Sequence, residues 1–276
     1  MRVMTQQEVN IAIDWAATEG WNPGIYDVDR FYAADRTGFL IGLLGDEPIA
    51  TISAVKYGES FGFIGFYIVK PEYRGKGYGI QIWNAALASL KDRNIGLDGV
   101  VAQQSNYKKS GFTLAYNNVR YQGNGGGNFP TDPRIVQLST VPFEELCAYD
   151  EPFFPGNRAQ FLKSWVNQPQ GLALAILKNN KLAGYGVIRA CLTGYKIGPL
   201  FADSSELAEQ LFIALKSHAS EDVPVFLDIP TVNAAAIDLV KRHSMTAVFE
   251  TARMYTGKIP KLPISRLYGV TTFELG

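Results

Sequence analysis

The sequence has few of the residues that metal, redox and disulfide-bonded proteins require. Its 276 residues include two cysteines, Cys147 and Cys191, and two histidines, His218 and His243. The cysteines lie far apart, and neither histidine has a carboxylate or thiol at ligand spacing. We therefore predict no metal site, and two reduced, buried thiols in place of a disulfide.

An excess of charge of one sign and a long apolar run are absent as well. The 26 basic residues balance the 26 acidic ones, and no run reaches the roughly 18 apolar residues that span a bilayer. The N-terminal MRVMTQQEVN lacks the apolar core of a signal peptide. We expect a cytoplasmic protein without nucleic-acid or membrane partners, in which any anion site is local. Nothing in the sequence indicates an oligomeric state.

What the sequence does contain is a globular composition divided by one glycine-rich segment. Hydrophobic residues make up 47% and charged residues 19%, which is enough to build a sizeable core. Residues 122–130 (QGNGGGNFP) cannot contribute to a packed core and read as a linker. We therefore predict two α/β domains, residues 1–121 and 131–276.

The first half alternates helical and strand patterns. Thr5 and Glu8 have the spacing of a capping box at the start of a first helix. The further segments are a helix at 27–34, strands at 39–44, 49–57 and 61–69, a helix at 80–90, and strands at 97–101 and from Gly111 to Tyr116.

The second half repeats this order of elements. Its predicted strands cover 135–138, 172–177, 183–190, 195–201, 225–229 and 247–255, and its helices cover 143–149, 158–166, 206–217 and 234–242. Two halves of similar length and order indicate an internal duplication.

The strongest functional signal is a glycine-rich turn between an apolar strand and an amphipathic helix. Gly75, Gly77 and Gly79 alternate there, with Arg74 and Lys76 beside them. Glycine lets the backbone approach a ligand, and the first turn of the helix offers unpaired N–H groups and a partial positive charge. This arrangement favours a phosphate group.

The common nucleotide motifs do not fit this turn. A dinucleotide fingerprint that starts at Gly75 needs glycine at Ile80, and a Walker loop that ends there needs glycine at Lys70. The pattern that fits is Arg-x-x-Gly-x-Gly, from Arg74 to Gly79, after a Val-x-Pro-x-Tyr approach. In this it resembles the acetyl-CoA signature of the GNAT superfamily of N-acetyltransferases.

A second segment carries the same resemblance. Asn106 to Phe112 is similar to the family's Tyr-x-x-x-Gly-Phe segment, although the helix before it, from Gln103, looks short. By position, the resemblance makes Tyr107 the general acid that protonates the departing CoA thiolate. The alternative is a tyrosine that only packs on the cosubstrate or the sheet.

The resemblance implies two tandem domains, each with a mixed, mainly antiparallel sheet flanked by helices. It also implies direct attack of an amine on bound acetyl-CoA, without a metal. Strand residues 67–69 would splay from their neighbour and offer backbone N–H groups. The residues so implied for the cosubstrate are Tyr67, Ile68, Val69, Arg74, Gly75, Lys76, Gly77, Tyr78, Gly79 and Asn106, with Lys108 and Lys109 as further candidates.

The acceptor side is less defined. Trp21 and Asn22 fall where the family lines its acceptor pocket, although Trp21 would equally suit a core. An ammonium acceptor must lose a proton, and Asp35, Glu59 and Asp98 are the carboxylates considered as base. A water relay would leave no trace in the sequence.

The second half resembles the same superfamily without its phosphate turn. Asn233 to Leu239 matches an Asn-x-x-Ala-x-x-Leu stretch, and Arg253 to Gly257 reads Arg-Met-Tyr-x-Gly. The segment 196–203 (KIGPLFAD) has no arginine-glycine loop, so we expect this half to be degenerate and unable to bind CoA. The expected function is acetyl transfer from acetyl-CoA to a primary amine of a small molecule. The alternative is a non-catalytic acyl-CoA sensor or interaction module.

Overall fold

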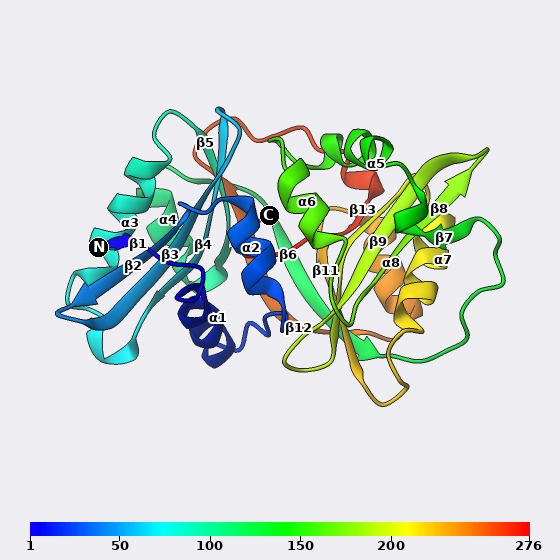
Figure 1. Cartoon of the computed structure of the whole chain (residues 1–276), viewed down its shortest axis with the longest axis horizontal. Coiled ribbons are helices and arrows are strands. Elements are labelled where there is room, and N and C mark those ends of the chain that lie inside the picture. Colours follow the sequence, from blue (N-terminus) through cyan, green and yellow to red (C-terminus); the bar gives the residue numbers. More distant parts are fainter.

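A computed structural model describes residues 1–276 and follows the predicted order of elements closely (Figure 1). The first half contains β1 (Arg2–Val3), α1 (Val9–Thr18), α2 (Asp27–Ala34), β2 (Phe39–Leu44), β3 (Glu47–Tyr57), β4 (Phe61–Val69), α3 (Tyr78–Ser89), β5 (Asn94–Val100), α4 (Gln104–Lys109) and β6 (Thr113–Asn124). The second contains β7 (Ile135–Gln137), α5 (Phe143–Asp150), α6 (Ala159–Trp165), β8 (Leu172–Lys178), β9 (Lys181–Ala190), β10 (Tyr195–Ala202), α7 (Ser205–Lys216), β11 (Pro224–Pro230), α8 (Ala234–Arg242), β12 (Thr246–Tyr255) and β13 (Leu267–Gly269).

Helices cover both faces of the first half's sheet. Alternation along β3 sends Ile52 and Ala54 to the face under α3, and Val55 and Tyr57 to the face under α1 and α2. The bonds of the predicted capping box form in the turn before α1, because the Thr5 amide donates to the Glu8 carboxylate at 2.8 Å and the Glu8 amide to the Thr5 hydroxyl at 3.3 Å, but the residue that directly precedes the helix is Glu8 and not Thr5. A mainly antiparallel sheet flanked by helices is therefore confirmed as the fold class.

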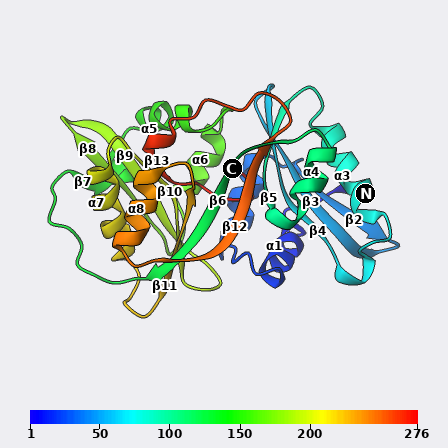
Figure 2. The ribbon, with the colours of Figure 1, turned by 180° about the vertical axis from the view of Figure 1, so that it is seen from behind.

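The two halves exchange their last strands. The sheet order is β1-β2-β3-β4-β5-β12-β6-β11-β10-β9-β8-β7, so β12 of the second half lies between β5 and β6 of the first. Reciprocally, β6 lies between β12 and β11, antiparallel to both. Figure 2 shows these two long strands crossing the middle of the molecule. Each half thus completes the other's sheet.

This exchange corrects two boundaries. The last strand of the first half was predicted to end at Tyr116, but β6 continues to Asn124 because β11 and β12 pair with it on both sides. Residues 122–124 of the predicted linker are therefore in a strand. Two more of its residues are tied down, since the Gly125 amide donates to the Val223 carbonyl at 2.8 Å and the Gly126 amide to the Ala219 carbonyl at 2.6 Å.

The segment from Leu267 to Gly276 was not predicted, and every residue of it is buried. It first forms β13, which pairs antiparallel with β10. It then runs into the space between the halves, where the chain end lies in Figure 1. Arg158 donates to the Thr271 hydroxyl at 3.0 Å and to the Gly276 carbonyl at 3.2 Å, and Tyr57 donates to the Leu275 carbonyl at 3.0 Å. We call residues 267–276 the tail.

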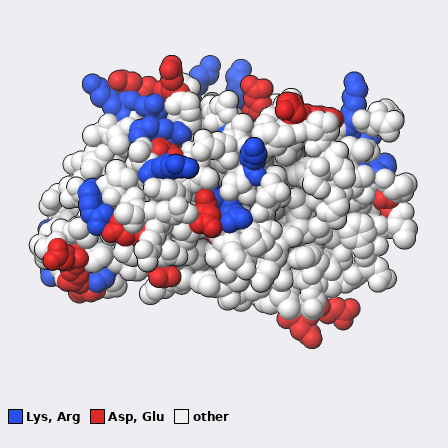
Figure 3. Space-filling model, in the orientation of Figure 1, with Lys and Arg blue, Asp and Glu red and all other residues white.

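No helix of the structure is at once long enough and apolar enough to cross a membrane. On the face in Figure 3, basic and acidic side chains are interspersed, and large areas carry neither. This face therefore presents no extended surface of one charge sign.

Candidate active site

The main cavity of the molecule has a volume of about 480 Å³ and lies where β4 and β5 part. The glycine-rich turn lies at one end, and side chains from the second half line the cavity too. The lining includes Glu19, Trp21, Gly65 to Val69, Arg74, Gly75, Gly77, Gly79, Ile80, Trp83, Leu97 to Val100, Gln103, Tyr107, Phe249, Thr251, Phe273 and Glu274. The cavity therefore needs both halves of the chain.

The two parallel strands pair only over their first residues. Pairing of β4 with β5 runs from Phe61–Asn94 to Ile64–Leu97 and stops, although β4 continues to Val69. The β5-facing backbone of residues 65–69 therefore has no strand partner. This confirms the splay expected at Tyr67, Ile68 and Val69.

A bulge marks the point where the strands part. Against β3, the register shifts between Thr51–Ile68 and Ser53–Gly65, which places one extra residue in β4. Phe66 takes up the distortion with a φ of 47°, in the left-handed region that bulky residues avoid. A strained residue at the wall of a cavity is typical of a functional site.

The glycine turn has the geometry of an anion cradle. Gly75 and Gly77 have φ values of 74° and 83°, and a side chain there would point into open space. Gly77 immediately precedes α3, and no side chain caps the first amides of this helix. Gly79 has no room for a side chain, because a Cβ would lie 2.6 Å from the Tyr67 hydroxyl. The turn thus leaves the N-terminus of α3 free for a ligand.

The charged residues at the turn differ in their surroundings. Arg74 forms an ion pair with Glu19, and its Nε donates to the Val69 carbonyl at 2.8 Å. The Lys76 ammonium lies over the Tyr73 ring, 5.5 Å from its centre. Arg74 lines the cavity, whereas Lys76 does not.

Two other predicted cosubstrate residues also lie outside the cavity wall. Tyr78 packs its ring against that of Tyr73, with 6.0 Å between centroids. Asn106 is exposed and donates to the Gln103 side chain at 2.7 Å. Gln103, which belongs to neither predicted motif, lines the cavity instead.

Tyr107 lies on the short helix α4, and its ring is buried against β5. A Cβ on Gly99 would come within 2.1 Å of this ring, so the glycine is what allows the tyrosine to lie flat on the strand. The Tyr107 hydroxyl has no hydrogen-bond partner in the protein, and the side chain lines the cavity. Burial raises the pKa of Tyr107 to about 12, with a smaller contribution from Tyr67. Such a group keeps its proton at neutral pH.

Aromatic side chains enclose the end of the cavity away from the glycine turn. Trp21 comes from the loop before α2, Phe249 from β12 and Phe273 from the tail. The Arg120 guanidinium lies beneath two of them, 5.8 Å from the Phe249 ring and 5.1 Å from the Phe273 ring. The last two rings come from the second half, which the sequence analysis had not connected with this pocket.

Asn22, the other predicted acceptor residue, is turned away from the cavity. Its side chain donates to the Thr193 carbonyl at 2.9 Å and accepts from the Thr193 amide at 2.9 Å. Its own carbonyl accepts from the Lys196 ammonium at 3.1 Å. Asn22 therefore joins the two halves and is not among the residues that line the cavity.

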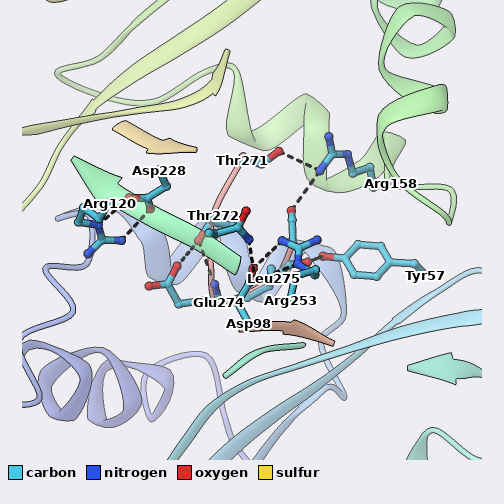
Figure 4. Close-up of polar contacts among 12 residues, drawn as sticks. Tyr57, Asp98, Arg120, Arg158, Asp228, Arg253, Thr271, Thr272, Glu274 and Leu275 are labelled. Carbon is cyan, nitrogen blue, oxygen red and sulfur yellow. Dashed lines mark hydrogen bonds and ion pairs between the residues drawn. The ribbon is translucent and has the colours of Figure 1, made fainter. Parts of the chain in front are cut away.

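Of the three carboxylates considered as base, only Asp98 reaches the cavity. It is buried and held by Arg253 at 2.5 Å and by Asn118 at 2.8 Å. Asp35 accepts from the Thr37 hydroxyl at 2.8 Å and from the Lys56 amide at 3.1 Å, and Glu59 is exposed in a turn. Glu274, a buried carboxylate that no sequence pattern indicates, also lines the cavity (Figure 4).

Comparison with known proteins finds the same fold and family over both halves. The Acetyltransferase (GNAT) family model matches residues 8–112, and an Acetyltransferase (GNAT) domain model matches residues 146–269. The holothin acyltransferase of Pseudoalteromonas sp. (strain SANK 73390) is 31% identical, over 98% of this chain and 92% of its own length.

Solved structures extend the likeness in fold. A putative acetyltransferase from Pyrococcus horikoshii superposes with a TM-score of 0.84 at 23% identity, over 100% of this chain and 95% of that one. A tandem GNAT protein from the clavulanic acid biosynthesis pathway superposes with a TM-score of 0.64 at 10% identity, over 94% and 98%.

Proposed function

Because this chain belongs to the GNAT acetyltransferase family and has its two-domain form, we propose that it moves an acetyl group from acetyl-CoA to a primary amine of a small molecule. The acyltransferase assignment follows from the family. The acetyl donor, the amine and its small size are the proposal.

One observation supports acetyl-CoA as the donor: the gap between β4 and β5 leads directly to the glycine turn. A diphosphate fits the turn, because Gly75 and Gly77 leave open space before the uncapped amides of α3. A pantetheine arm fits the splay, because the backbone of residues 65–69 has no strand partner there. We assign the diphosphate to Arg74, Gly75, Gly77 and Gly79, and the arm to residues 67–69.

When bound, acetyl-CoA supplies the thioester whose acyl group is transferred. The backbone N–H groups near the Phe66 bulge would polarise the thioester carbonyl as an oxyanion hole does. Tyr107 would donate a proton to the departing sulfur, since its raised pKa keeps the hydroxyl protonated. The amine would attack directly, with both substrates bound in the one cavity.

The enclosed aromatic end supports a small acceptor. Trp21, Phe249 and Phe273 leave room for a compact molecule, and part of the cavity of about 480 Å³ is needed for the donor. The relative that matches almost the whole chain is named for acylating holothin, which supports a small-molecule acceptor here as well.

The test is turnover and binding measured on the same preparation. We expect CoA to bind, and an amine panel with acetyl-CoA to release free thiol together with an N-acetylated product identified by mass. CoA binding without turnover across a broad panel, or turnover only with longer acyl-CoAs, would contradict the proposal. CoA-dependent capture of another protein without turnover would favour the sensor alternative.

A further inference from the structure

We propose that Glu274, which the tail of the second half delivers into the first half's cavity, is the general base for the acceptor amine. This inference rests on the proposed function, because it names the base of that same reaction. It also gives the degenerate half a direct part in catalysis.

The tail places Glu274 directly against the bulged strand. A Cβ on Gly65 would lie 2.1 Å from the Glu274 carbonyl oxygen, so the tail backbone packs on β4 one residue before Phe66. The preceding residue, Phe273, forms part of the aromatic end. Glu274 therefore lies between the bulge, where the acyl group is expected, and the acceptor's aromatic wall.

Glu274 is also the one cavity carboxylate without a basic partner. Glu19 is paired with Arg74, and Asp98 is paired with Arg253 at 2.5 Å. No basic group lies within ion-pair distance of Glu274, and its carboxylate accepts a hydrogen bond from the Thr272 hydroxyl, as Figure 4 shows. An unpaired carboxylate in a cavity wall is free to accept a proton from a substrate.

Basic side chains lie behind Glu274, on the side away from the cavity's first half, in a buried cluster of charges. Three buried basic side chains lie close enough to interact with it electrostatically: Arg120 of β6, Arg189 of β9 and Lys196 of β10. Arg120 is paired with Asp228 at 2.7 Å and Arg189 with Asp27 at 3.0 Å, whereas Lys196 has no carboxylate partner. Glu274 and Lys196 are thus the acid and the base of this cluster that have no ion-pair partner.

The step is balanced in protons. The Glu274 carboxylate takes one proton from the ammonium and leaves a neutral amine, whose nitrogen bonds to the thioester carbonyl carbon as the carbon–sulfur bond breaks. The nitrogen gives up a second proton, which replaces the one that Tyr107 donates to the sulfur. The products are an amide, a thiol and one proton, which Glu274 releases to water.

The experiment is a pH profile of Glu274→Gln with a reactive amine. We expect kcat/KM to fall about 100-fold at pH 7, which is typical of a lost general base. Above the pKa of the amine the acceptor arrives neutral, so the defect should shrink to less than tenfold. CoA affinity should stay within twofold of wild type. Glu19→Gln, at another carboxylate of the cavity, should show no defect that shrinks with pH.

Further variants distinguish a general-base role of Glu274 from a purely structural role as the counter-charge of Lys196. Glu274→Gln leaves Lys196 unbalanced, so the double variant Glu274→Gln with Lys196→Met restores a neutral cluster. We expect it to recover thermal stability without recovering activity at pH 7. If Glu274→Gln does not fold, Glu274→Asp is measured, and its smaller defect should also shrink as pH rises.

Three results would overturn the inference while leaving the proposed function intact: full activity of Glu274→Gln at pH 7, a defect equal at every pH, or recovery of activity by the neutral double variant. Absence of turnover in the wild-type protein would instead count against the proposed function itself.

Discussion

The two halves contain the same structural opening, and only one of them leaves it open. In the first half, β4 and β5 part after Ile64–Leu97 and the cavity lies between them. In the second half, the parallel strands β10 and β11 part after Ile197–Leu227, and β13 of the chain itself enters the gap. There β13 pairs with β10, and the Val270 amide donates to the Asp228 carbonyl of β11 at 2.8 Å. We call the gap between β4 and β5 the first slot and the gap between β10 and β11 the second slot; the protein's own strand fills the second.

The helices that follow the two slots also differ, because the N-terminus of α3 is uncapped and that of α7 is capped. Gly77 precedes α3 with a φ of 83° and no side-chain cap, so the first amides of α3 are free. Ser204 precedes α7, and its hydroxyl accepts from the Leu207 amide at 3.4 Å. A helix that caps itself has less need of an external anion. The proposed acid has no counterpart either, since the residue six positions before the following strand is Tyr107 in the first half and Val240 in the second.

The comparison teaches that a lost site can still serve a neighbouring one. β13, which fills the second slot, is the first part of the tail, and the tail then brings Phe273 and Glu274 to the cavity of the first half. Substitutions in the two slots should therefore have opposite consequences, catalytic or binding in one and structural in the other.

The sharpest way to test this difference is Tyr107→Phe. Removing the hydroxyl should lower kcat about 100-fold or more, because the thiolate then departs without a proton. CoA affinity should stay within a few-fold of wild type. Tyr121→Phe, in β6 and outside the cavity, is the control and should match wild type. Unchanged kcat in Tyr107→Phe would remove this residue as the acid.

The second slot is tested by Leu267→Ala, which weakens the inserted strand. Leu267 is 3% exposed, so truncation should lower the free energy of unfolding by about 2–4 kcal/mol. Binding of CoA should keep a stoichiometry of one per chain in wild type and variant, measured by calorimetry. Leu44→Ala, at a 48% exposed leucine, should cost less than about 0.5 kcal/mol. Binding of a second equivalent of CoA per chain, in either protein, would contradict the claim that the second slot is closed to CoA.

The first slot's glycine turn is tested by Gly77→Val. A β-branched residue avoids a φ of 83°, so the turn should reorganise and CoA affinity should fall at least tenfold. Gly45→Val is the matched control, because Gly45 has a φ of 61° and open space around it in a hairpin turn. Both variants should lose similar stability, and only Gly77→Val should lose CoA. Equal affinities would mean that the turn does not hold the diphosphate.

A smaller effect is expected from Glu19→Gln, which frees Arg74 for phosphate. An exposed ion pair is worth about 1 kcal/mol or less, so CoA affinity should rise by no more than about fivefold, and less at high salt. Glu47→Gln, which loses a pair with Lys70 at 2.8 Å on the same edge, should leave affinity unchanged. Weaker CoA binding in Glu19→Gln would show that Glu19 assists the cosubstrate.

The titration of Tyr107 should have no effect on kcat between pH 7 and 10. The acid form of Tyr107 is required, and with a pKa raised to about 12 this form is lost only as pH rises through 12. Between pH 7 and 10, kcat should therefore not decline through this residue. A falling limb near pH 9 that disappears in Tyr107→Phe would contradict the assignment.

The sequence allowed most of the local structure to be predicted, because burial patterns and breakers are local. The bounds of β4 and α8 agree with the predicted segments, and the glycine turn and the short α4 lie where expected. The strand exchange could not be predicted, since the alternation along β6 and β12 specifies a buried face and not which strand lies beside it. The tail, with its apolar sequence around Thr271 and Thr272, gives no sign of the cavity that it enters.

The sequence by itself determined the glycine turn, the tyrosine after it and the absence of both in the second half, since these depend on residues close together in the chain. Only the tertiary structure decided which residues enclose the aromatic end of the cavity. Trp21 lies near the start of the chain and Phe249 and Glu274 near its end, and what brings them together is a strand exchange and a buried tail. Such contacts follow from the packing of the whole chain, which no local pattern encodes.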